Sequence, residues 1–179
     1  MSFDLQGNSL TGASQNGAAQ YAAALQQLSN YAGDPLGLAE QLIAAEPGFV
    51  MAQALKAWLY LLGTDAKAAA AIQAAIAEAE RLPSNARGQG HVAAVKALAG
   101  GRFHQASRII EDVSVQYPRD LLALIAGHQL DFFTGNSRML RDRIGRAAPH
   151  WSKSMAGYHS LLGMHAFGLE EMGDYAQAE

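Results

Sequence analysis

The sequence predicts an all-α protein built from a row of helical hairpins, and a repeated motif is the first reason. Residues 101–106 (GRFHQA) are followed by Pro118, and the same order of glycine, aromatic residue and Gln-Ala returns 72 residues later (173 − 101) at residues 173–178 (GDYAQA). Half of that separation is 36 residues, and a period of this size is typical of helix–turn–helix repeat proteins.

The second reason is that glycine and proline recur at the same period. Turn glycines are spaced by 30, 38, 34 and 38 residues, and prolines by 36, 35 and 31 residues. Glycine tolerates the left-handed conformation that ends many helices, and proline cannot continue a helix that precedes it. We therefore expect each hairpin to have glycine between its two helices and proline after the second. The positions are Gly33, Gly63, Gly101, Gly135 and Gly173, with Pro47, Pro83, Pro118 and Pro149.

Composition agrees with a helical fold and limits the partners. Half of the residues are hydrophobic and many of these are alanine, whereas aromatic residues make up only 8%, which favours closely packed helices over sheets. The net charge of −3 gives no basic excess that would attract nucleic acid or an acidic membrane. No cysteine and no signal peptide are present, and the apolar window Leu121–Phe133 is too short to span a bilayer. We expect a soluble, cytoplasmic protein.

The first part of the chain divides into a lead-in and four helices. Residues 1–13 are rich in Gly, Ser, Asn and Gln without a period, which predicts a flexible lead-in, and residues 14–179 form the repeat domain. Ser14, Asp34 and Asp65 precede apolar stripes with helical spacing and are expected to cap helices, with Pro35 at the first helical position. The stripes are Tyr21, Leu25 and Leu28; Leu38, Leu42 and Ile43; Met51, Leu55, Trp58, Leu59 and Leu62; and the alanine-rich residues 66–82.

The second part predicts six further helices and no sheet. A helix over residues 89–98 has an uncertain start because Gly88 and Gly90 are poor helix formers. The next helix has a stripe with spacing i, i+3, i+4 and i+7, and Asp120 caps a helix that is apolar on nearly every side. We expect further helices over residues 137–147 and 152–172, the latter capped by Ser152, and one more after Gly173. No stretch alternates with period two. The stripe residues are Ala106, Ile109, Ile110 and Val113.

The segment from residue 101 to Pro118 resembles the tetratricopeptide repeat, in which a small residue, an aromatic residue and an alanine precede proline. Three further segments, residues 118–124 (PRDLLAL), 161–171 (LLGMHAFGLEE) and 173–179 (GDYAQAE), are similar to the tetratricopeptide repeat protein 38 family. The resemblance covers roughly residues 21–179. It implies a tetratricopeptide-like α-solenoid of about four and a half hairpins and supplies no activity, cofactor or partner. We expect the amino-terminal part of a longer protein, truncated in its last hairpin.

The predicted function is that of a non-catalytic interaction scaffold. Successive hairpins rotate slightly, so a row of them leaves a concave groove that suits a peptide or a partner protein. The first helices of the hairpins line this groove, and their polar and aromatic residues are the candidate partner-binding residues. These are His91, His128, Asp131, Phe132, His165 and Glu170.

Two alternatives remain open at this point. One is a metal-dependent or acid/base hydrolase that uses His91, His128, His165 and Glu170, although no zinc motif, nucleophile elbow or phosphate loop is present, so we assign no catalytic residue, metal or cofactor. The other is a structural piece that positions other domains. Because the last hairpin stops early, we also expect an exposed apolar patch over residues 158–172 and self-association through it.

Overall fold

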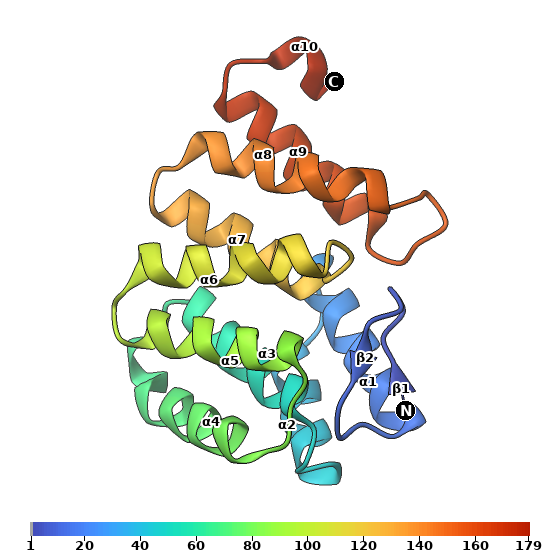
Figure 1. Ribbon diagram of the computed structural model, residues 1–179, viewed down its shortest axis with the longest axis vertical. Coiled ribbons are helices and arrows are strands. Elements are labelled where there is room, and N and C mark those ends of the chain that lie inside the picture. The colour runs from blue at the N-terminus through green and yellow to red at the C-terminus, as the bar shows by residue number, and fades with distance from the viewer. Residues whose placement is uncertain (1) are drawn as a thin grey trace.

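The computed structural model describes residues 2–179, which form ten α-helices, two short 3-10 helices and one small β-hairpin (Figure 1). The predicted all-α class is confirmed. The strands are β1 (Ser2–Phe3) and β2 (Ser9–Leu10); the 3-10 helices are η1 (Ala66–Ala68) and η2 (Ala148–His150); the α-helices are α1 (Gln15–Ser29), α2 (Pro35–Ala45), α3 (Val50–Leu62), α4 (Ala69–Arg81), α5 (Ala86–Ala99), α6 (Phe103–Gln116), α7 (Leu121–Phe133), α8 (Ser137–Ala147), α9 (Tyr158–Glu171) and α10 (Tyr175–Ala178).

Helices that follow one another in the sequence pack against one another throughout the described chain. Additional packing joins α3 to α5, α6 to α8 and α7 to α9, so each hairpin also contacts the next one. In Figure 1 the helices from α5 to α10 follow one another along the long axis, and α1 to α4 lie beside one another in the half of the molecule away from α10. The row is also curved strongly enough for α1 to contact α7.

Four of the five predicted turn glycines adopt the left-handed conformation between two helices. Gly33, Gly101, Gly135 and Gly173 have φ values of 73°, 73°, 67° and 78°, in the left-handed region that a Cβ disfavours. Gly63 is the exception, because its φ is −73° and the left-handed residue of that turn is Thr64, with φ 54°.

Four of the five predicted helix caps are also confirmed. Ser14 Oγ accepts a hydrogen bond from the backbone N–H of Gly17 (3.0 Å), and Asp34 Oδ1 accepts one from Gly37 (2.8 Å). Asp120 Oδ1 accepts one from Ala123 (3.1 Å) in the same way. Asp65 caps η1 by accepting a hydrogen bond from the N–H of Lys67. Each cap satisfies a backbone donor that the first turn of a helix leaves free.

Helix α5 begins earlier than its glycines suggested. Asn85 caps the helix, which includes Gly88 and Gly90. A Cβ on Gly90 would lie 2.4 Å from Val113 Cγ2, so this glycine lets α5 and α6 approach closely. The cost of glycine in a helix is therefore offset by packing, which the local sequence does not reveal.

Ser152 does not cap the following helix, which corrects the prediction. Helix α9 begins at Tyr158, after Gly157 in the left-handed conformation with φ 86°. Ser152 Oγ instead bonds to Ser154 Oγ (3.0 Å). Residues 152–157 form a loop with Trp151 at its base, where the indole Nε1–H donates to the carbonyl of Pro118 (2.8 Å).

The amino-terminal segment differs from the expected lead-in without strands. β1 and β2 pair antiparallel, with Ser2 opposite Leu10, and Leu10 is buried in the main core. Polar side chains tie this hairpin to distant elements, because Gln6 Nε2 donates to the carbonyl of Ala156 (2.9 Å) and Asn85 Nδ2 donates to Ser9 Oγ (3.0 Å). Long-range hydrogen bonds give this segment a structure that its composition does not predict.

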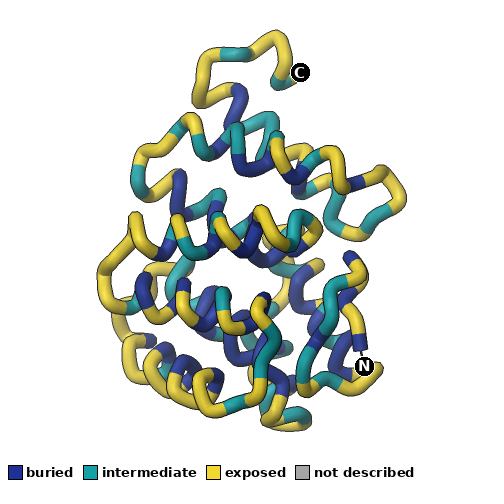
Figure 2. Tube along the Cα trace, in the orientation of Figure 1, coloured by how far each residue is buried: buried dark blue, intermediate teal, exposed yellow. Residues whose placement is uncertain are grey.

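The core runs along the row of helices (Figure 2). One cluster of buried residues extends from α1 to α7, and a second joins α7, α8 and α9, so α7 belongs to both. The helix that is apolar on nearly every side is therefore packed between its neighbours on both sides. Each buried Leu, Ile or Phe contributes about 1.5–3 kcal/mol to stability.

Candidate functional site

A cavity of about 730 Å³ lies between four helices that are distant in sequence. One wall consists of the carboxyl-terminal end of α1 with the residues that follow it, and a second consists of the carboxyl-terminal end of α3. Helix α7 forms the third wall and α9 the fourth. All four are the first helices of their hairpins. We call this cavity the inner pocket; its lining residues lie within residues 28–31, 59–63, 125–132 and 159–167.

Aromatic side chains form one wall of the inner pocket. The ring of Phe167 lies between those of Phe132 and His128, with centroid separations of 5.9 Å and 5.7 Å and with the rings tilted or edge to face. Phe132 is 51% exposed although it is a large apolar residue. Exposed aromatic groups in a concave site are the usual anchors of binding surfaces.

Contacts between α1 and α9 bound the inner pocket at one side. His159 Nε2–H donates to Asn30 Oδ1 (2.7 Å), and Ser160 Oγ donates to the carbonyl of Ser29 (3.4 Å). These pairs join residues about 130 positions apart, so the first and last hairpins meet across the curved row. Tyr31 lies at this rim and is 93% exposed.

The inner pocket carries no formal charge in its lining. Its lining side chains are apolar groups, hydroxyls, an amide and two imidazoles, with no Asp, Glu, Lys or Arg among them. An ionised ligand would lose hydration there without gaining a partner of opposite charge, which is costly. The pocket therefore suits an uncharged group.

His128 is the polar group of the aromatic wall. Its Nε2–H donates to the carbonyl of Met164 (3.0 Å), which fixes the tautomer, because a carbonyl can only accept. Burial lowers the pKa of His128 and outweighs the opposing effects of this hydrogen bond and of Asp131. The imidazole is therefore neutral near pH 7, and its Nδ1 is a hydrogen-bond acceptor. No donor of the described residues bonds to this Nδ1, and the atom is not enclosed.

A buried polar network lies deeper in the stack, at the start of α5 and α7. Arg87 Nε donates to Asp120 Oδ2 (2.6 Å), and its Nη2 lies 2.9 Å from Asp4 Oδ2 in the β-hairpin. Burial alone would raise the pKa of Asp120, but Arg87 and His91 hold it well below its usual range. The ionised carboxylate thus joins α5, α7 and the hairpin.

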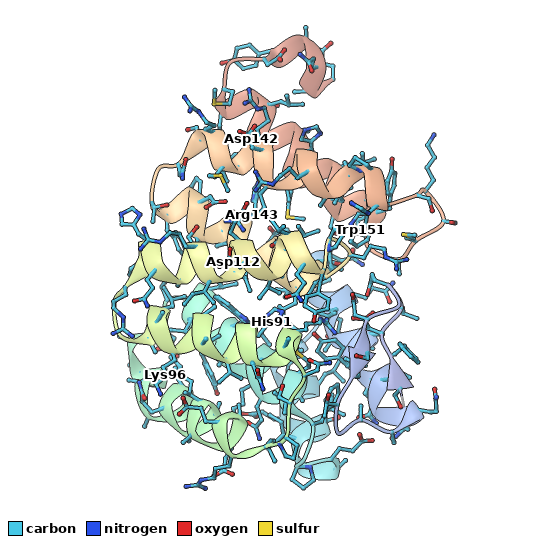
Figure 3. The ribbon with its side chains drawn as sticks, in the orientation of Figure 1. His91, Lys96, Asp112, Asp142, Arg143 and Trp151 are labelled. Atoms are coloured by element: carbon cyan, nitrogen blue, oxygen red, sulfur yellow. The ribbon has the colours of Figure 1, made fainter. Side chains whose placement is uncertain are left out.

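His91 belongs to this network and is fully buried (Figure 3). Trp58 Nε1–H donates to His91 Nδ1 (3.0 Å), so Nδ1 carries no proton and Nε2–H donates to Asp120 Oδ2 (2.8 Å). Both ring nitrogens are therefore used within the protein. An imidazole in this state supports the fold, and a partner at the surface does not reach it.

Asp131 belongs to a second buried network, between α6, α7 and α8. Arg143 binds it through two nitrogens, with Nε to Oδ2 at 2.8 Å and Nη2 to Oδ1 at 3.1 Å. Ser107 Oγ donates to Asp131 Oδ1 (2.9 Å), and Arg143 Nη1 lies 2.6 Å from Glu111 Oε2. The other oxygen of Glu111, Oε1, pairs with Arg146. Figure 3 shows Arg143 inside the helical stack.

The structure thus divides the six predicted partner-binding residues into three groups. His128 and Phe132 lie together in the inner pocket. His91 and Asp131 are fully buried in the two polar networks. His165 lines a different, shallow depression beside Arg141 and Asp174, and Glu170 is exposed near the end of α9.

Sequence reasoning missed most of the pocket's apolar lining, including Leu28, Leu62 and Met164. Leu28 and Leu62 share one signal, since each lies in the last turn of a first helix shortly before a turn glycine. Phe132 has the same position before Gly135. Large apolar residues at that position could have identified the site.

Metal-binding geometry is not present in the part of the chain that the structure describes. No group of three or more His, Asp or Glu side chains in residues 2–179 is placed to hold a metal ion. His91, His128 and His165, which the hydrolase alternative brought together, lie in three different environments. None of the described helices combines the length and the apolar character needed to cross a membrane.

Comparison with known proteins adds no assignment. No protein-family model matches this chain, and no solved structure matches it either.

Proposed function

We propose that this protein is a non-catalytic interaction scaffold that holds a peptide or partner protein at the inner pocket. One observation carries the proposal: four first helices converge on an uncharged, mostly apolar cavity with an exposed aromatic wall. In repeat proteins of paired helices, the first helices form the concave binding face. The concave face that contains the inner pocket is therefore the proposed binding surface.

The proposal includes the architecture of a tetratricopeptide-like α-solenoid related to the tetratricopeptide repeat protein 38 family. The consecutive packing of hairpins, the contacts between neighbouring hairpins and the left-handed turn glycines support it. The strong curvature that brings α1 to α7 and α9 distinguishes this row from an open one. Such curvature turns a long groove into a bounded pocket.

Binding is favoured over hydrolysis by the chemistry of the pocket. His128 is neutral and bonded to a backbone carbonyl, and no carboxylate lines the cavity beside it. A general base needs a proton to take from a bound reactant and a group that orients it. The observed wall instead offers aromatic surface and one acceptor, which are recognition features.

The test fills the inner pocket without disturbing the fold. Gly163 lies on α9 at the pocket, and a Cβ placed there meets no atom within 4 Å. The substitution Gly163→Leu should therefore occupy the pocket while improving helix propensity by about 0.8 kcal/mol. The matched control is Ala74→Leu, which adds a leucine to the exposed side of α4 outside the pocket.

The purified wild-type protein and both variants are used to capture partners from a lysate, with quantitative mass spectrometry as the readout. We expect a partner that the wild-type protein and Ala74→Leu recover equally and that Gly163→Leu recovers at least about tenfold less, because even one blocked anchor contact costs a factor of this size. Equal recovery by all three proteins would remove the inner pocket as the binding site.

A further inference from the structure

We propose that the inner pocket receives an uncharged aromatic side chain that bears a hydrogen-bond donor, namely a tyrosine or tryptophan of the partner. This inference rests on the proposed function, because it names the chemistry of the group that the pocket holds. Three features of the lining residues lead to it: they include no Asp, Glu, Lys or Arg, they form an aromatic wall, and one of them, His128, has a ring nitrogen free to accept a hydrogen bond.

The absence of charge excludes most polar anchors. A lysine, arginine, aspartate or glutamate side chain would enter a lining without an opposite charge, and each would lose its hydration. The remaining anchors are uncharged side chains, which are aliphatic, aromatic or neutral polar.

The wall selects aromatic groups among these. The rings of Phe132, Phe167 and His128 already contact one another edge to face or tilted, at centroid separations of 5.7 to 5.9 Å. A further ring continues this arrangement because aromatic pairs prefer offset or edge-to-face contacts at such distances. The half-exposed Phe132 has surface available for it.

The acceptor selects a ring with a donor. His128 Nε2–H is committed to Met164, and the other ring nitrogen, Nδ1, accepts no hydrogen bond from the described residues. A phenolic O–H or an indole N–H supplies the missing donor, whereas phenylalanine and leucine leave the acceptor without a partner. Tyrosine and tryptophan are also the side chains most enriched among binding anchors.

The cavity is large enough for such a group. Its volume of about 730 Å³ lies in the range of pockets that enclose organic molecules of moderate size. The volume is therefore sufficient for one bulky side chain.

The experiment uses side-chain analogues, so it does not need the partner. Toluene represents phenylalanine and p-cresol represents tyrosine, and NMR titration of the full chain gives the dissociation constant of each. The two molecules differ in hydration, so the quantity that matters is the change in their affinity ratio between wild type and His128→Phe. We expect the p-cresol to toluene affinity ratio to fall about fivefold in the variant, the size of one neutral hydrogen bond.

Two further measurements separate the hydrogen bond from general effects of the substitution. His128→Gln keeps both an acceptor and a donor at the position, and should retain part of the preference for p-cresol. In the wild-type protein the ¹⁵N resonance of His128 Nδ1 should move with p-cresol and stay unchanged with toluene. This second readout holds even if His128→Phe does not fold.

Each outcome decides a different point. A fall in the ratio together with the Nδ1 shift supports the inference. Binding of both molecules with an unchanged ratio and no Nδ1 shift would overturn it, and would leave the proposed function standing. If neither molecule binds the wild-type protein, or if both bind the wild-type protein and Gly163→Leu equally well, the inner pocket is not an apolar binding site and both proposals fail.

Discussion

At the scale of single residues, two buried arginines dominate the interior. Arg87 and Arg143 are each 1% exposed, and each contacts carboxylates from two other elements. Removing one partner of such a group leaves an uncompensated buried charge, which costs more than the intact pair contributes. The Arg87 network therefore fixes α5 and α7 against the β-hairpin, and the Arg143 network fixes α6, α7 and α8 against one another.

The first prediction concerns Arg143. Arg143→Ala should lower the free energy of unfolding by about 3–5 kcal/mol, because Asp131 remains buried without its guanidinium partner and Glu111 loses one of its two arginine partners. Urea denaturation followed by circular dichroism measures the loss. The matched control Arg138→Ala removes an exposed arginine on the same helix and should change stability by less than about 0.5 kcal/mol. Equal losses in both variants would show that the buried network is not what stabilises α8.

The second prediction concerns the pH dependence caused by Asp120. Its pKa is lowered in the folded protein, so its contribution to stability is present above the unfolded value of about 4 and is lost as the pH falls below it. Asp4 acts in the opposite sense, because burial raises its pKa despite Arg87. Comparison of the wild type with Asp120→Asn isolates the contribution of Asp120 to the pH dependence of stability.

The difference in unfolding free energy between wild type and Asp120→Asn should be largest at pH 6–7 and should shrink as the pH falls from about 4 to 2. Urea titrations at several pH values measure it. A difference that stays constant over this range would mean that Asp120 is not ionised in the folded protein.

At the scale of elements, α7 owes its position to a glycine. A Cβ on Gly127 would lie 2.6 Å from Arg143 Cζ, so the helix leaves room for the guanidinium against its backbone. The side chain of Arg143 cannot move away without leaving Asp131 and Glu111. The glycine and the arginine network therefore depend on each other.

The third prediction compares two helix glycines. Gly127→Ala should destabilise the protein by about 1–3 kcal/mol because of overpacking, although alanine is the better helix former. Gly145→Ala on α8 is the matched change, since its Cβ would meet only His165 Nε2 at 3.6 Å, and it should stabilise by about 0.5–1 kcal/mol. Thermal unfolding of both variants gives the signs. Stabilisation by both substitutions would contradict the close approach of Arg143.

Elements that depend on residues nearby in the sequence were predictable, whereas elements that depend on contacts with residues distant in the sequence were not. The caps at Ser14, Asp34 and Asp120 and the turn at Gly101 follow from neighbouring residues, and the structure confirms them. The β-hairpin depends on bonds to Ala156, Asn85 and Arg87, which lie far away in the sequence. The start of α5 depends on packing against α6.

The site was predictable in part for the same reason. The sequence places His128 and Phe132 on a first helix, and they lie in the inner pocket. It also places His91 and Asp131 on first helices, but only the partners Trp58, Asp120 and Arg143 show that these two side chains are buried within the protein. Periodicity identifies the helix, whereas the face that remains open depends on the curvature of the whole row.

At the scale of the whole molecule, two surfaces are candidate sites of association with another protein chain. One is the inner pocket, and the other is the end of the row, where Met172 of the predicted patch over residues 158–172 and the neighbouring Tyr175 are 40% and 67% exposed. Self-association through the latter surface stays a prediction. An apolar patch at the end of a repeat row resembles the surface that the next hairpin would cover.

The fourth prediction tests that end surface. Sedimentation at increasing concentration should show dimers of the wild-type protein, and Met172→Glu combined with Tyr175→Glu should shift the protein toward monomer, because charge on an apolar contact is costly. The inner-pocket variant Gly163→Leu should dimerise like the wild type. A wild-type protein that stays monomeric at the highest concentrations would remove this surface from consideration.

The most direct test of the inner pocket is photo-crosslinking from two exposed tyrosines. A benzophenone amino acid replaces Tyr31, at the rim of the pocket, or Tyr175, on α10 outside it. The captured partner should crosslink strongly from position 31 and weakly from position 175, and Gly163→Leu should abolish the product from position 31. Crosslinking from position 175 alone, or a product at position 31 that survives Gly163→Leu, would contradict binding in the inner pocket.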